Sequence, residues 1–228
     1  MGQMTSFKRP DGKSVQGYLA EPAKPGGPGL VVIQEWWGMN DQIKGVADRF
    51  ARAGYRALVP DLYRGKIALE ANEADHLMKG LNFGDAAGQD IRGAVQFLKA
   101  KSARVGVTGF CMGGALTVLA AVNVPEADAG VIWYGYPPIE YVDASKIRIP
   151  LMGHWATRDA AFPIAGVDAL EKKLNAANVK LEFHRYDAKH AFANETADSK
   201  KLDMLKYDKA AADLAWQRTS DFFARTLA

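Results

Sequence analysis

The chain of 228 residues is 48% hydrophobic, so it is long and apolar enough to bury a sizeable core. Its 29 Lys and Arg residues and 26 Asp and Glu residues leave a net charge of +3, too small a surplus to indicate nucleic acid or an acidic membrane as a partner. The single cysteine excludes an internal disulfide bond and a metal site made of several cysteines. Because no secretory segment and no membrane-spanning stretch is visible, we expect a soluble, cytoplasmic protein.

The N-terminal quarter contains three strand-like runs and one amphipathic helix. Residues 15–22 alternate like a half-buried strand, and the turn before them predicts a hairpin with the first residues. Residues 30–34 form a continuous apolar run, which is typical of a strand covered on both faces. Asn40 or Asp41 is a candidate cap for the helix that follows, and Gly54 ends that helix before another strand.

The same alternation continues to the C-terminus. Further strands are predicted at 104–109, 129–135, 149–155 and 179–186. Helices are predicted at 70–82, 86–100, 114–122, 164–178 and 208–226. Strands that alternate with helices predict a mostly parallel sheet with helices on both faces. Because no linker, repeat or boundary is visible, we expect residues 1–228 to form a single α/β domain.

The only cysteine, Cys111, lies in a glycine-rich turn between a predicted strand and a predicted helix. Gly109, Cys111 and Gly113 give G-x-C-x-G, the pattern of a nucleophile elbow with cysteine in place of serine. The glycines let strand and helix approach, and the helix N-terminus favours a thiolate. The backbone N–H of Met112 could then face an oxyanion. The alternatives are an inert buried thiol, which leaves the glycines unexplained, and a phosphate-binding turn, which lacks the expected lysine or glycine pattern.

A nucleophile of this kind needs a histidine and an acid, which should follow it in the order acid, histidine. His154 and His184 fall inside predicted strands, where a packed or exposed ring is expected. His190 lies just past the carboxyl end of a strand, where loops converge on the edge that carries Cys111. Asp159 lies between a strand and a helix, and a helix cap is its alternative role. Residue type, order and position together favour Cys111, Asp159 and His190.

A glutamate and two tryptophans follow the buried strand at 30–34. In sheets of this kind this turn supplies a second oxyanion donor, here the backbone N–H of Trp36. Glu35 would then lie close to Cys111. Taken alone, Glu35 is more simply explained as an exposed carboxylate at a strand end.

Several segments in order resemble the dienelactone hydrolase family of α/β-hydrolases: Q-E-W-W-G-x-N, P-D-L-Y, G-F-C-M-G-G, the Asp159 loop and K-H-A-F. The resemblance covers nearly the whole chain and implies an α/β-hydrolase fold with a mostly parallel sheet of about eight strands. It implies a catalytic triad of Cys111, His190 and Asp159. It also implies that Glu35 contacts the resting thiol and is displaced when substrate binds.

The activity implied by the resemblance is hydrolysis of an ester or lactone through a thioester acyl-enzyme. The N–H groups of Trp36 and Met112 would hold the oxyanion, and no metal or organic cofactor would be needed. The partner would be a small-molecule substrate, with no nucleic acid and no membrane, and the protein would be a monomer or a small homo-oligomer.

This sequence departs from the family where arginines bind the carboxylate of dienelactone. Asn194 stands four residues after His190, and Lys79 is the nearest basic residue in the helical segment after P-D-L-Y. We therefore expect a neutral, fairly apolar or aryl ester or lactone instead of dienelactone. The candidate substrate-binding residues are Trp36, Tyr134, Phe162, Phe192, Asn194 and Lys79. Core packing is the alternative for the aromatic residues, and it is an equal alternative for Trp37 and Trp155.

Two other functions remain open from the sequence. The same thiolate and oxyanion donors could attack a phosphotriester. Alternatively, the protein could be a redox-responsive thiol protein on a hydrolase scaffold, although it has no second cysteine to resolve an oxidised Cys111.

Overall fold

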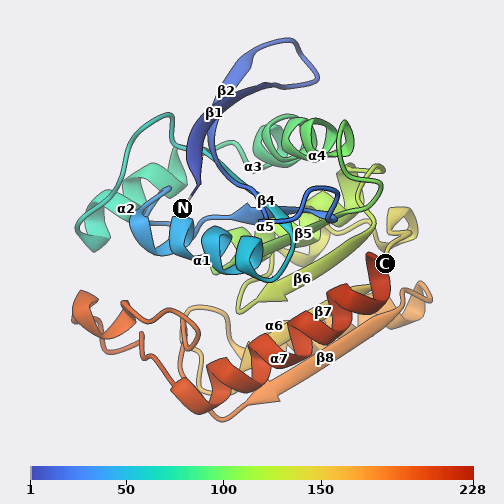
Figure 1. Ribbon diagram of the computed structural model, residues 1–228. Helices are drawn as coiled ribbons and strands as arrows, with labels where there is room; N and C mark the ends of the chain where they lie inside the picture. The colour runs from blue at the N-terminus through green and yellow to red at the C-terminus, as the bar shows by residue number, and fades with distance from the viewer. Residues whose placement is uncertain (1) are drawn as a thin grey trace.

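The computed structural model describes residues 2–228, which build one eight-stranded sheet in the order β1-β2-β4-β3-β5-β6-β7-β8. The strands are β1 (Gln3–Lys8), β2 (Ser14–Ala20), β3 (Gly29–Ile33), β4 (Arg56–Pro60), β5 (Val105–Phe110), β6 (Ala129–Trp133), β7 (Leu151–Ala156) and β8 (Leu181–Tyr186). The β1–β2 hairpin pairs antiparallel with β4, and the strands from β4 to β8 are parallel (Figure 1). The mostly parallel α/β sheet expected from the sequence is confirmed.

The helices follow the predicted order. They are α1 (Asp41–Arg52), α2 (Ala71–Lys79), α3 (Phe83–Asp85), α4 (Arg92–Lys99), α5 (Met112–Asn123), α6 (Ile164–Ala176) and α7 (Lys209–Thr226). Asn40 caps α1, because its side chain accepts a hydrogen bond from the Ile43 N–H at 3.1 Å. The helix predicted at 86–100 begins instead with a π-helix, Ala86–Ile91, before α4. Among residues 2–228, no helix has both the length and the apolar character needed to cross a membrane.

The central strands are covered on both faces, which explains their continuous apolar runs. Successive side chains of β3 point to opposite faces of the sheet. Leu30 and Val32 join a core with residues of α1 and α7, whereas Val31 and Ile33 join a second core with residues of α4 and α5. In Figure 1 the hairpin lies at one end of the molecule and the long α7 toward the other.

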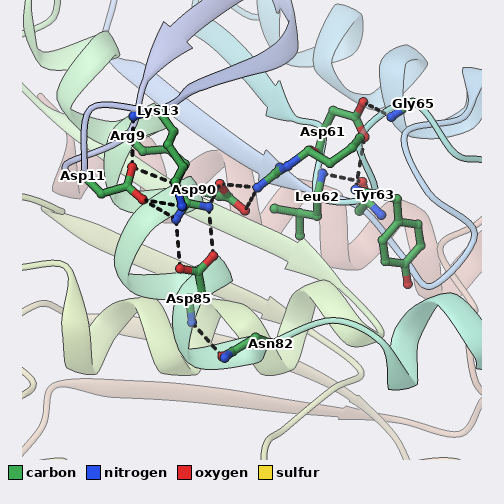
Figure 2. Close-up of polar contacts among 12 residues, drawn as sticks. Arg9, Asp11, Lys13, Asp61, Leu62, Tyr63, Gly65, Asn82, Asp85 and Asp90 are labelled. Atoms are coloured by element: carbon green, nitrogen blue, oxygen red, sulfur yellow. Dashed lines mark hydrogen bonds and ion pairs between the residues drawn. The ribbon is translucent and has the colours of Figure 1, made fainter.

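A network of charges around the buried Arg9 and Asp90 joins the β1–β2 hairpin to the segment before α4 (Figure 2). Arg9 is 7% exposed and pairs with Asp11 and Asp85, each at 2.8 Å, and with Asp90 at 3.1 Å. Asp90, which lies in the π-helix, also accepts two hydrogen bonds of 2.9 Å from Arg64. Buried charges need such complete pairing, so the network fixes how these segments pack.

Candidate active site

Cys111 occupies a strained turn between β5 and α5. Its φ of 56° and ψ of −117° lie in a region that costs a non-glycine residue on the order of 1–3 kcal/mol. The backbone holds this turn, because the Cys111 N–H donates to the Trp133 carbonyl at 2.9 Å. A Cβ atom on Gly109 would lie 2.1 Å from the Gly113 carbonyl oxygen, and one on Gly113 would lie 2.5 Å from the Ile33 carbonyl oxygen. Close contact between strand and helix therefore requires both glycines, and it places the thiol at the helix N-terminus.

His190 and Asp159 meet in the loops that follow β8 and β7. The His190 Nδ1 lies 2.7 Å from the Asp159 Oδ2, and both side chains are buried. The other carboxylate oxygen of Asp159 accepts hydrogen bonds from the N–H groups of Ala161 and Phe162, each at 2.8 Å. Asp159 therefore caps the turn of its own loop, while Pro163 is the residue that precedes α6. The structure brings the acid and the histidine together and leaves the other ring nitrogen for a different partner.

The Cys111 thiol influences the protonation of this imidazole. Burial of the imidazole opposes its charged form, but the negative charge of Cys111 and hydrogen bonds to Asp159 and Cys111 outweigh burial and raise the pKa of His190 to about 10. Phe162 stacks on the His190 ring with centroids 5.5 Å apart. The raised pKa of His190 favours an imidazolium in the loop after β8.

Glu35 is buried directly after β3, not exposed at the strand end. The Tyr134 hydroxyl donates to its Oε1 at 3.2 Å, and the Asn194 side-chain amide donates to its Oε2 at 2.7 Å. Burial raises the pKa of Glu35, against the nearby positive charge of His190 and these two hydrogen bonds. The contact between Glu35 and the resting thiol that the resemblance implies stays a prediction, because the hydrogen bonds described for this carboxylate come from Tyr134 and Asn194.

The two expected oxyanion donors lie at the ends of neighbouring strands. β3 and β5 are paired in parallel, with Ile33 opposite Gly109, so the turns that carry Trp36 and Met112 follow the same edge of the sheet. Within the described chain, neither the Trp36 nor the Met112 backbone N–H has a hydrogen-bond acceptor. Both groups are therefore available to an oxygen atom from outside the protein.

The predicted substrate-binding residues divide into two groups. The Phe162 and Trp36 side chains are half-buried, and Phe162 lies against His190. Tyr134 and Phe192 have no exposed surface, and their rings pack against each other with centroids 5.2 Å apart. Asn194 is also buried, with its amide group on Glu35. These last three residues are buried, and the expectation that they contact substrate stays a prediction.

The remaining candidate binding residues lie on the surface or in the core. Lys79 lies on the surface of α2, where it pairs with Asp75 at 2.6 Å, and its part in substrate binding stays a prediction. Trp155 belongs to a core cluster with α6 residues such as Leu170, so core packing is the correct interpretation. Trp37 is buried as well, beneath the Lys200 ammonium group, which lies 3.9 Å from its ring centroid.

The sequence interpretation missed Thr196, which fixes the direction of Asn194. The Asn194 Oδ1 accepts hydrogen bonds from both the N–H and the hydroxyl of Thr196, each at 2.8 Å. This is an Asx turn, in which an asparagine side chain binds the backbone two residues later. The N-E-T sequence at 194–196 was the available signal.

Comparisons with known proteins agree with this geometry. The protein usf of Aquifex pyrophilus is 38% identical over 239 residues and covers 100% of both chains. A protein of Aquifex aeolicus (strain VF5) with the provisional name carboxymethylenebutenolidase is 32% identical over 234 residues, 98% of each chain. The crystal structure of a provisionally named dienelactone hydrolase from Klebsiella pneumoniae subsp. pneumoniae MGH 78578 has a TM-score of 0.83 and 26% identity, covering 98% of this chain and 99% of that one.

The family model described as the dienelactone hydrolase family matches residues 15–227. That match runs from the second strand to the end of the last helix, so it includes every residue of the site. With whole-length relatives and a fold of the same topology beside it, the chain belongs to the dienelactone hydrolase family.

Proposed function

We propose that this protein hydrolyses ester or lactone bonds of small molecules, with Cys111 as the nucleophile. The observation that carries the proposal is the chain of contacts from Asp159 through His190 to Cys111. A carboxylate that orients an imidazole, which in turn takes the proton of a thiol, is the arrangement that nucleophilic catalysis requires. Membership of the family supports the same reaction class.

In the acylation half-reaction, the Cys111 sulfur attacks the carbonyl carbon and the carbonyl oxygen becomes an oxyanion. The N–H groups of Trp36 and Met112 donate hydrogen bonds to that oxyanion. When the tetrahedral intermediate collapses, the bond to the leaving oxygen breaks and His190 gives that oxygen its proton. The products of this step are an alcohol, or the open end of a lactone, and a thioester on Cys111.

Acylation changes what His190 can do. The negative charge of Cys111 is the largest influence that raises the pKa of His190, and forming a thioester removes that charge. The pKa therefore falls, and the neutral imidazole can take a proton from water. The resulting hydroxide attacks the thioester carbonyl, the carbon–sulfur bond breaks, and the acid leaves with the thiolate–imidazolium pair restored.

The charges of the site favour a neutral substrate. Cys111, Asp159 and Glu35 are all acidic groups, and His190 is the base among them. Asn194 donates to Glu35 and carries no positive charge, so it cannot neutralise a substrate carboxylate. A second carboxylate in this place would be repelled and left without a cation. We infer that the substrate is a neutral, fairly apolar or aryl ester or lactone, with Phe162 and Trp36 beside the acyl carbon.

The test is hydrolysis of an aryl acetate by the wild-type protein and by Cys111→Ala. The wild type should turn over the ester, and quenched samples should show an acetyl group on the peptide that contains Cys111. The alanine variant should retain the fold and lose both signals. Turnover without the thiol would contradict the proposal. An aryl dialkyl phosphate assayed in parallel separates carbon esters from phosphotriesters, and peroxide treatment followed by mass spectrometry tests the redox alternative.

A further inference from the structure

The motif P-D-L-Y, residues 60–63, leads from β4 into a loop, 61–65, that its own hydrogen bonds hold in one conformation. One oxygen of the Asp61 carboxylate accepts from the Tyr63 N–H at 3.1 Å, and the other accepts from the Gly65 N–H at 2.5 Å. Figure 2 shows these contacts, with the Tyr63 ring extending away from the charge network. The loop therefore presents the Tyr63 side chain in a defined direction.

The loop is also tied to the charge network around Arg9 and Asp90. Arg64 lies in the left-handed region, with a φ of 55°. One nitrogen of its guanidinium donates to the Asp61 carbonyl at 2.7 Å, and the other donates to both oxygens of Asp90 at 2.9 Å. A backbone conformation that is uncommon for a residue with a side chain persists when its surroundings hold it in this way.

The loop reaches the side chains of both turns that carry the proposed oxyanion donors. The Tyr63 hydroxyl donates to the Met112 Sδ at 3.3 Å, and Met112 is the first residue of α5. The Leu62 N–H donates to the Gln34 Oε1 at 3.4 Å, two residues before Trp36. Because β3 pairs in parallel with both β4 and β5, the loop and the two turns follow the same edge of the sheet.

Burial and charge keep the Tyr63 hydroxyl a donor. The side chains of Tyr63 and Met112 are both buried, so no water competes freely for their contact. Burial, and then the negative charge of Cys111, raise the pKa of Tyr63, so the hydroxyl retains its proton in the range where an esterase works. The sulfur of Met112, which is a weak acceptor, receives that proton as a hydrogen bond.

The contact with Gln34 is kept at a cost. A backbone N–H can only donate, so the atom of Gln34 that faces the Leu62 N–H is the oxygen. The amide nitrogen is then left buried, and within residues 2–228 it has no hydrogen-bond partner. Native structures keep few such groups, because each one destabilises the fold. Stability alone therefore does not account for this arrangement.

We propose that Tyr63 is a positioning residue, which holds Met112 so that its N–H is directed at the oxyanion, while the Leu62 N–H holds Gln34 and the turn that carries Trp36. Donors aimed in advance stabilise the charge that develops in the transition state and do little for the bound ester. The inference rests on the proposed function, and it gives P-D-L-Y a role in it.

The test compares wild type with Tyr63→Phe, which keeps the ring and removes the hydroxyl. With an aryl acetate, kcat should fall by about three- to tenfold at unchanged KM, because one hydrogen bond that positions a donor is lost. Gln34→Met, which removes the acceptor of the Leu62 N–H, should lower kcat by a similar factor. The thermal unfolding midpoint of each variant confirms that it is folded.

A second readout isolates the oxyanion from the thiol. When 3-phenylpropanal adds to Cys111, the carbon–sulfur bond forms, the carbonyl π electrons move to oxygen, and that oxygen occupies the oxyanion site. Protection of Cys111 from iodoacetamide measures the dissociation constant of this adduct, since the protein has one cysteine. The constant should rise with Tyr63→Phe by the factor seen in kcat. Alkylation without aldehyde forms no oxyanion, so its rate should stay at the wild-type value.

A double substitution tests whether Tyr63 acts through Met112. Met112→Leu removes the sulfur and keeps a side chain of similar size, so it should reproduce the loss, and Tyr63→Phe should add nothing to it. The matched control is Tyr55→Phe, a buried tyrosine whose ring packs against Phe223, and it should change none of the readouts.

Three results would overturn the proposal: wild-type kcat and aldehyde affinity in Tyr63→Phe, an equal loss in the rate of simple alkylation, or a further loss in the Met112→Leu background. The aldehyde readout needs no turnover. A protein that hydrolyses no ester but binds the aldehyde less tightly after Tyr63→Phe would keep the inference and lose the function. A wild-type protein that the aldehyde does not protect would lose both.

Discussion

The carboxylate of Asp159 binds the imidazole of His190 with one oxygen, at 2.7 Å, and the turn of its own loop with the other. Both oxygens of the carboxylate are therefore engaged, which limits its rotation. The imidazole inherits this rigidity, because its Nδ1 is fixed toward Asp159 and its Nε2 is directed away from it. Asp159 thus serves the turn and the proposed chemistry with the same side chain.

Asp159→Asn should remove most activity while preserving the fold. The amide oxygen can still accept from the Ala161 and Phe162 N–H groups, which leaves the NH₂ group facing the His190 Nδ1. Since that group donates, His190 must carry its proton on the wrong nitrogen, and we expect kcat to fall by roughly 10³–10⁴-fold. Steady-state kinetics with an aryl acetate measures the loss, and the thermal unfolding midpoint is the control. A loss of less than tenfold would contradict the orienting role.

Removing the charge of Cys111 should lower the pKa of His190. In the wild type we expect the imidazole to titrate at about 10. In Cys111→Ala, and in wild-type protein alkylated on the same residue, that titration should move down toward the ordinary value. NMR titration of the four histidine rings measures it, and a His190→Gln sample assigns the signal. An unmoved titration would show that sulfur and imidazole are not coupled.

Protonation of His154 should destabilise the fold in mild acid. His154 is fully buried, with Nδ1 2.9 Å from the Tyr186 hydroxyl and Nε2 2.8 Å from the Thr219 hydroxyl. Burial, followed by the charges of His184 and Arg218, lowers its pKa well below 6.5 in the folded state. The unfolded chain therefore binds more protons, so this contribution to stability is complete above about pH 6.5 and decreases as pH falls below it.

Urea unfolding at pH 7 and pH 5 tests this expectation. Between these values the wild type should lose about 2 kcal/mol more than His154→Gln, since each pH unit below the unfolded pKa costs about 1.4 kcal/mol per proton. Glutamine has no proton to gain in this range. If the two proteins lost the same free energy of unfolding between pH 7 and pH 5, a group other than His154 would cause the destabilisation in acid.

The buried charge network should be a strong determinant of stability. Asp90→Ala leaves Arg9 with Asp11 and Asp85 alone and removes the ion pair of Arg64, and we expect it to lower the free energy of unfolding by about 1.5–3 kcal/mol. Lys79→Ala, which breaks the exposed pair with Asp75, should cost less than about 1 kcal/mol. Urea unfolding compares the two variants. The esterase activity of the Lys79 variant then tests whether Lys79 takes part in substrate binding.

The order of strands and helices was predictable because buried faces require apolar residues at the spacing typical of a strand or a helix. The apolar run at 30–34 marks a strand covered on both faces, and the structure buries all of β3. Asn40 was identified as a cap by its residue type and confirmed by its hydrogen bond to Ile43. The π-helix at Ala86–Ile91 was not predictable, because the spacing of apolar residues does not reveal one extra residue in a helical turn. Its Asp90 binds Arg9, which is far away in the sequence.

The site was predictable where residue type and chain order sufficed, and less so where side-chain direction decided the outcome. The sequence predicted that Cys111, Asp159 and His190 lie at one edge of the sheet; the structure brings Asp159 to 2.7 Å from the His190 imidazole, and the catalytic triad stays a prediction. It could not show that Phe192 and Tyr134 turn into the core, because position after a strand does not fix where a ring points. Pairings such as Asn194 with Glu35 join residues 159 positions apart, and no local pattern records them.

The anchored position of Glu35 also bears on how the reaction ends. An ester arrives uncharged, but the acid it yields ionises at neutral pH. In the proposed reaction, the departing anion lies near the Glu35 carboxylate and the regenerated thiolate, and repulsion from both should drive it into solvent. The same negative charges do not repel the uncharged ester but repel the acid product after each turnover. Accumulated acid should therefore inhibit this enzyme only weakly.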